Sequence, residues 1–109
     1  MPFLYKVLGQ SNPSATTNTT LYTVPAGNTA VISSIAICNQ AAANATFRLA
    51  VRPAGATIAA QHYIAYDTVI TGNDLLTISI GISLAATDVI TCYASTSTVS
   101  FSVFGSEIT

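Results

Sequence analysis

The sequence predicts an all-β fold: a single β-sandwich of about eight antiparallel strands, jelly-roll-like, with an N-terminal arm. Apolar residues recur at every second position in short runs, which is the period of a strand with one buried face. Glycine, proline and Asn/Asp clusters separate these runs at intervals of about 8 to 12 residues, as all-β folds require. A chain of 109 residues is long enough for one domain with one core. We therefore expect one compact unit.

The start of the chain is predicted to lie apart from this unit. Residues 3–8 have a strand pattern, and the polar, low-complexity stretch QSNPSATTNTT follows them. Such a stretch is typical of a flexible connector. We therefore divide the chain into an N-terminal arm and polar linker at residues 1–20 and a β-sandwich domain at residues 21–109. An arm of this kind can pair with the sheet edge of a neighbour.

The remaining strands follow from their patterns in order. Residues 29–38 are almost continuously apolar, which is typical of a central strand covered on both faces, one of them by a neighbouring subunit. Residues 75–84 alternate most cleanly, with Gly81 marking a bulge or a close backbone approach. Residues 88–95 alternate with a mixed second face, and residues 54–61 are expected to be a loop. The predicted strands are residues 3–8, 20–24, 29–38, 45–52, 61–70, 75–84, 88–95 and 98–105.

The charge content is the most informative feature for function. Only seven residues are charged, while half of the chain is apolar. A soluble monomer usually carries about a quarter charged residues. This deficit indicates a subunit that keeps part of its surface against other protein. Three basic side chains cannot supply the row of phosphate contacts that nucleic-acid binding needs. No apolar stretch is long enough to cross a bilayer and no export signal is visible, so we expect neither nucleic-acid nor membrane partners.

Catalytic chemistry is not indicated. The chain has one histidine and four acidic residues, and no serine has a conventional nucleophile motif around it. We therefore expect a protein that is not an enzyme, with no cofactor and no metal. Cys38 and Cys92 lie far apart in strand-like contexts, and we interpret them as reduced, buried thiols, with a disulfide as the alternative. Asp67, Asp74 and Asp88 flank turn signals and are interpreted as turn formers, with a calcium site as the alternative.

Several side chains are candidates for contacts between subunits. His62 is either a partly buried residue bonded to a backbone carbonyl or one of three that meet on a threefold axis. Arg48 and Arg52 share a strand face, where they are either solvated or paired with aspartates of a neighbouring subunit. Tyrosine combines an apolar ring with a polar tip and suits core, protein or sugar contacts. The candidate assembly contacts are Phe3, Tyr5, Lys6, Arg48, Arg52, His62, Tyr63 and Tyr66.

The order of segments along the chain resembles a family of small tailed-bacteriophage virion proteins. The segments that carry this likeness are KVLGQS at 6–11, LYTVPAG at 21–27, ICN at 37–39, FRLAV at 47–51, HYIAYD at 62–67 and VFGSEI at 103–108. The resemblance implies a β-sandwich that assembles as a homotrimer and attaches to the virion as a head decoration, or cement, protein that bridges capsid subunits.

Further expectations follow from this resemblance. The partners would be other copies of the chain and the major capsid protein or another virion protein, and assembly would take place in the host bacterial cytoplasm. The alternative is a tail or fibre-tip module whose loops at 39–44 and 53–61 bind a host receptor or glycan. Those loops are rich in alanine and poor in aromatic and amide groups, which disfavours the alternative. The resemblance brings no catalytic residues with it.

Overall fold

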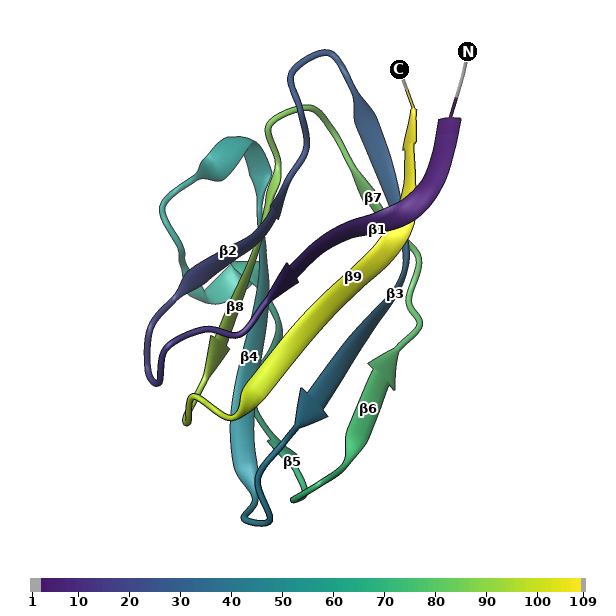
Figure 1. Cartoon of the computed structure of the whole chain (residues 1–109). Helices are drawn as coiled ribbons and strands as arrows, with labels where there is room; N and C mark the ends of the chain where they lie inside the picture. Colours follow the sequence, from purple (N-terminus) through teal and green to yellow (C-terminus); the bar gives the residue numbers. More distant parts are fainter. Residues whose placement is uncertain (1–2, 109) are drawn as a thin grey trace.

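The computed structural model describes residues 3–108, and side chains from residue 5 onward. It contains nine strands and two short 3-10 helices, coloured in chain order in Figure 1. The strands are β1 (Phe3–Ser11), β2 (Thr19–Thr23), β3 (Thr29–Asn39), β4 (Ala45–Arg52), β5 (Tyr63–Ile70), β6 (Leu75–Ile78), β7 (Ile82–Leu84), β8 (Val89–Ala94) and β9 (Val99–Ile108). The 3-10 helices are η1 (Pro53–Gly55) and η2 (Ala60–His62). Within the described residues, no helix is long and apolar enough to span a membrane.

The strands form two antiparallel sheets that pack against each other as a β-sandwich. Sheet A has the order β1-β9-β3-β6, with β7 also paired to β3, and sheet B has the order β2-β8-β4-β5. If β6 and β7 are counted as one interrupted strand, each sheet has four strands. The chain then passes repeatedly from one sheet to the other, as in a jelly roll. The predicted fold class is therefore confirmed.

The core lies between the inner faces of the two sheets. Sheet B contributes Phe47, whose ring meets that of Phe101 from sheet A edge-on, at 6.1 Å between ring centroids and an interplanar angle of 70°. Edge-to-face packing of this kind is a favoured aromatic geometry. Alternate residues of the strands surround this pair, because successive side chains of a strand point to opposite faces. The other fully buried large apolar side chains are Val24, Ile32, Ile35, Ile37, Leu49, Ile70, Ile90, Val99 and Val103.

The first strand belongs to the sandwich instead of standing apart from it. It pairs with β9 of the same chain over its whole length, and β1 and β9 lie side by side in Figure 1. A bulge at Leu8 lets that side chain pack against the core. At Gly9 the backbone approaches β2 so closely that a Cβ would overlap the carbonyl oxygen of Leu21. The expectation of a tethered arm is thus corrected for this strand, because β9 offers it an open edge. Residue 20 as a domain boundary stays a prediction.

The segment with the cleanest alternation is two strands and not one. Residues 79–81 leave the sheet, and Ile80, expected on the buried side, is exposed. The break lies opposite the place where the pairing of β3 with β9 shifts register, between Ile32 and Ser34. A bulge of this kind bends its strand, so a neighbour cannot follow it continuously. Gly81 has open space around it, so the close approach expected there is wrong.

The exposure of two strands bears on their predictions. β3 is central in sheet A, and Val31 and Ser33 on its outer side are exposed within one chain, so cover of that side by a neighbouring subunit stays a prediction. β8 in sheet B is the opposite case, since nearly every residue of it is buried. The segment 53–62, which contains η1 and η2, lies over the outer face of sheet B beside β8 and β4. This cover explains the mixed second face of β8.

Candidate functional site

The outer face of sheet A is a broad surface that carries no charged side chain among the described residues. Register and alternation define this outer face, which we call the A face. Tyr5 is 79% exposed and Leu75 is 60% exposed, at opposite edges of the sheet. Serine, threonine, glutamine and small apolar residues lie between them. The described residues of the A face are Tyr5, Val7, Gln10, Thr29, Val31, Ser33, Ser34, Ala36, Cys38, Leu75, Thr77, Ser83, Ser100, Ser102, Phe104, Ser106 and Ile108.

One ion pair of the chain lies at the inner side of sheet A. The ammonium of Lys6 is 2.8 Å from Oε1 of Glu107, and the hydroxyl of Tyr22 donates to Oε2 at 2.5 Å. Glu107 and Tyr22 are both buried, so each satisfies the other in the interior. The hydrogen bonds from Lys6 and Tyr22 lower the pKa of Glu107. Burial, together with the bond to Glu107, raises the pKa of Tyr22. The three side chains tie β1, β9 and β2 together.

This network predicts a loss of stability in acid. A carboxylate whose pKa is lowered in the folded state stabilises the fold above its unfolded pKa, about 4.3, and ceases to do so as pH falls through the folded value. We expect the free energy of unfolding to fall below about pH 4.3. The Glu107→Gln variant should be less stable than wild type at pH 7, with a difference that shrinks toward pH 2 to 3. Urea denaturation of both proteins across this range measures it, and parallel pH curves would contradict it.

Arg48 forms its ion pair within the chain. Its Nε donates to Oδ1 of Asp67 at 2.7 Å and its Nη2 to Oδ2 at 3.3 Å. The guanidinium also lies over the rings of Tyr66 and Tyr93, 4.2 Å from each centroid. The hydrogen bond to Asp67 is the main cause that raises the pKa of Arg48. Arg48 thus has an aspartate partner within its own chain, because β5 presents Asp67 beside it, and pairing with the aspartate of a neighbouring subunit stays a prediction.

The aspartates have local roles. Asp67 has a φ of 50°, in the left-handed region, at an irregularity of the β4–β5 pairing. Asp74 accepts from the hydroxyl of Thr71 and the amide of Leu75, and these bonds lower its pKa. Asp88 accepts from two backbone amides of neighbouring turns. The interpretation as turn formers is confirmed for Asp74 and Asp88. Across residues 3–108, no three His, Cys, Asp or Glu side chains gather as metal ligands.

The remaining candidates are distributed over different parts of the fold. The Nδ1 atom of His62 accepts from the amide of Ala59 at 3.0 Å, so its backbone partner is an amide and not the expected carbonyl. Tyr63 and Tyr66 contact each other edge-on, 4.9 Å apart. The backbone of Phe3 pairs with Ile108, and its side chain lies outside the described part of the chain. As contacts between subunits, all eight candidates stay predictions.

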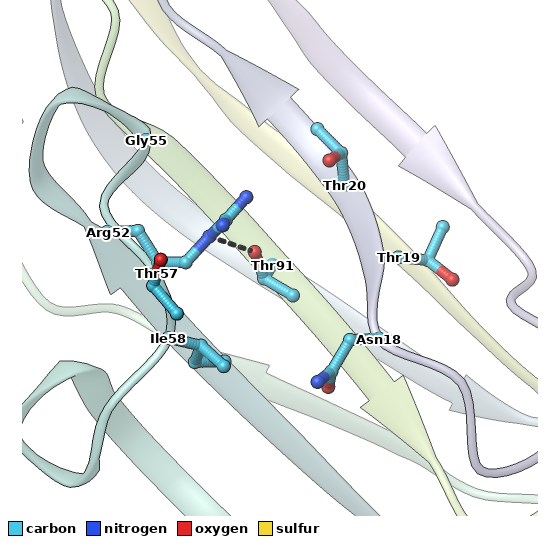
Figure 2. Close-up of a pocket in the computed structure, with 8 residues that line it drawn as sticks. All are labelled: Asn18, Thr19, Thr20, Arg52, Gly55, Thr57, Ile58 and Thr91. Atoms are coloured by element: carbon cyan, nitrogen blue, oxygen red, sulfur yellow. Dashed lines mark hydrogen bonds between the residues drawn. The ribbon is translucent and has the colours of Figure 1, made fainter.

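The outer face of sheet B holds a polar pocket of about 330 Å³. Figure 2 shows Arg52 extending across β8, with its Nε donating to the hydroxyl of Thr91 at 3.0 Å. The segment 53–58 forms one wall, and the start of β2 forms the other. The lining residues are Asn18, Thr19, Thr20, Arg52, Gly55, Thr57, Ile58 and Thr91.

An apolar hollow of about 610 Å³ lies next to this pocket, with Ile58 in both linings. Its other lining residues are Ala59, Ala60, Tyr63 and Tyr66. The loop at 53–61 is itself poor in the aromatic and amide groups that hold a sugar. The fold supplies both kinds of group from elsewhere, because Asn18 comes from the chain before β2 and the tyrosines from β5. No local pattern in the sequence predicts that these side chains come together.

The two cysteines are free thiols, as predicted, and they lie in different sheets. Cys38 is only partly buried, because it is on the outer side of β3, so the prediction of a buried thiol is wrong for it. Cys92 is fully buried, and burial raises its pKa to about 11. A thiol that stays protonated at neutral pH is a weak nucleophile. Two features of the described residues offer room for another molecule: the uncharged A face and the polar pocket on sheet B.

Comparison with known proteins gives no further guide. A scan against protein-family models finds no match, and searches of curated proteins and of solved structures find none either. The resemblance to small tailed-phage virion proteins therefore stays a proposal.

Proposed function

We propose that the protein is a non-enzymatic structural protein of a tailed-bacteriophage virion. In this proposal it forms a homotrimer and decorates the head, where it bridges subunits of the major capsid protein. The segment order that resembles small virion proteins supports the proposal from the sequence. The compact sandwich supports the proposal on physical grounds, since a decoration protein must stay folded on an exposed shell without being replaced.

The observation that carries the proposal is the A face. All seven charged residues have partners elsewhere in the chain: four form the two ion pairs, Asp74 and Asp88 accept turn bonds, and Arg52 donates to Thr91. None of the seven lies on the A face. The cores of protein interfaces are depleted of charge in the same way, and large exposed apolar patches mark contact sites. A face that combines Val31, Phe104 and Leu75 with uncharged hydroxyl groups suits permanent contact with protein.

We expect the A face to form the contact between subunits. Val31 lies near its centre and is 40% exposed, so Val31→Asp places a charge in the proposed interface without touching the core. Burial of an unpaired carboxylate costs several kcal/mol, roughly enough to dissociate a small trimer. Light scattering should give a mass near three chains for wild type and near one chain for the variant.

Ile64→Asp is the matched control. Ile64 is 41% exposed and lies on β5 at the edge of sheet B, so the substitution makes the same chemical change on the other sheet. Ile64→Asp should keep the mass of wild type, and circular dichroism should show that both variants are folded. A trimer that survives Val31→Asp and dissociates with Ile64→Asp would refute the assignment of the A face.

A further inference from the structure

Arg52 is held in place but keeps unused capacity for hydrogen bonds. Its Nε donates to Thr91, and its Nη1 donates to the carbonyl oxygen of Ala56 at 3.2 Å. A guanidinium has five N–H donors, so these two bonds fix its plane and leave others for a ligand. Within the part of the chain that the structure describes, Arg52 has no carboxylate partner, whereas Arg48 on the same strand has one. The pocket therefore contains a positioned and uncompensated positive charge.

The other groups around the pocket favour a ligand rich in acceptors. The polar side chains that accompany Arg52 and Thr91 are those of Asn18, Thr19, Thr20 and Thr57, and no acidic residue is in the lining. Arginine recognises carboxylates through paired, charge-assisted hydrogen bonds. Hydroxyl and amide side chains can each donate to and accept from the hydroxyl groups of a ligand. The volume of about 330 Å³ is at the lower end of small-molecule sites.

The adjoining hollow supplies an apolar platform. Tyr66 is 57% exposed, and its edge-on contact with Tyr63 and the guanidinium of Arg48 on its ring fix its orientation. A rigid aromatic ring offers a broad apolar face and a polar tip at a small entropic cost. Ile58 lies between this platform and the polar pocket. Together the two hollows offer a charged, hydroxyl-lined site beside an aromatic one.

We propose that this surface of sheet B binds an acidic saccharide, a chain of sugar rings of which one bears a carboxylate. The carboxylate pairs with the free N–H groups of Arg52, and the hydroxyl groups of the same ring bond to Asn18, Thr20 and Thr57. The next ring packs over Ile58 and against Tyr66. This site is on the sheet opposite to the A face, so the proposal goes beyond the decoration role and does not depend on it.

The test is a calorimetric titration of the full chain with a tetrasaccharide that contains glucuronate. The comparison ligands are the same tetrasaccharide with its carboxylates reduced to alcohols, and inorganic phosphate. We expect wild type to bind the acidic form at least about tenfold more tightly than the reduced form, because only the former pairs with Arg52. Absence of binding to the acidic form at millimolar concentration overturns the proposal. If the reduced form binds as tightly as the acidic form, the carboxylate has no role in binding. If phosphate binds as tightly as the acidic tetrasaccharide, the claim that the ligand is a saccharide is overturned.

Four variants locate the site. Arg52→Gln should weaken binding of the acidic tetrasaccharide about tenfold or more, while Lys6→Gln removes the same charge from β1 of sheet A, away from both hollows, and should change it less than about threefold. Thr57 is exposed, so Thr57→Glu leaves the fold intact and should also weaken binding, whereas Thr57→Gln keeps a hydrogen-bonding group without the charge and should weaken it less. Equal losses for Lys6→Gln and Arg52→Gln would indicate attraction to net charge and refute the site.

Discussion

Gly105→Ala is expected to destabilise the protein by about 3 kcal/mol or more. Gly105 lies in β9 between Lys6 of β1 and Ile32 of β3. A Cβ there would overlap the carbonyl oxygen of Val31 and lie 3.0 Å from the Cα of Ile32. Both are backbone atoms of the central strand of sheet A. The strands cannot separate to admit the methyl group without breaking their hydrogen bonds, so urea denaturation should give a much lower midpoint or an unfolded protein.

Gly81→Ala is the control for Gly105→Ala. No atom lies within 4 Å of the position that its Cβ would take. The change should therefore alter the free energy of unfolding by less than about 0.5 kcal/mol. Equal losses at the two positions would mean that the close approach of β9 to β3 does not determine stability.

Asn39→Ala is expected to lower the free energy of unfolding by about 2 to 4 kcal/mol. Asn39 ends β3 and is 1% exposed. Its Nδ2 donates to the carbonyl oxygens of Ala43 at 2.8 Å and of Ile70 and Thr71 at 3.3 Å. Its Oδ1 accepts, at 3.1 Å each, from a backbone amide and from the hydroxyl of Thr98. Alanine would leave these groups without partners at the end of the sandwich. Thermal denaturation of the variant and of wild type measures the loss in the free energy of unfolding.

Asn44→Ala provides the comparison for Asn39→Ala. Asn44 is exposed, and its Oδ1 accepts from the amide of Gly72 at 3.2 Å. Water can replace that one acceptor, so the loss should be below about 1 kcal/mol. If both variants lose the same amount, the buried network around Asn39 is not what holds the loops together.

The strands could be predicted from the sequence because alternation is a local property. The boundaries of β4 are those expected from the pattern at 45–52, and the turn chemistry of Asp74 and Asp88 was recognised from the neighbouring residues. The interruption between β6 and β7 was missed because its cause, the bulge at Ser33, lies in a strand about fifty residues earlier. Pairing of β1 with β9 was missed for a similar reason, since no local signal tells a strand which edge it will find.

In the candidate sites, too, local patterns could be predicted from the sequence and long-range partners could not. The sequence placed Arg48 and Arg52 on one face, which the structure bears out, but it could not supply their partners. Tyr93 and Thr91 come from β8, and register alone brings them under the two guanidinium groups. Glu107 is not among the candidates from the sequence. A single acidic residue in an otherwise apolar terminal strand nevertheless indicates a buried partner. The charge-poor composition predicts a contact surface, and the topology brings uncharged side chains together on the A face, where we propose that this surface lies.

The mass of the protein in solution, alone and with undecorated phage heads, tests the central claim most directly. Light scattering on the purified wild-type chain should give about three times 11.2 kDa. Sedimentation of heads mixed with increasing amounts of the trimer should then show binding that saturates. A trimer that saturates the heads is the result that the proposed decoration role predicts. A monomer of 11.2 kDa that leaves the heads bare would contradict it.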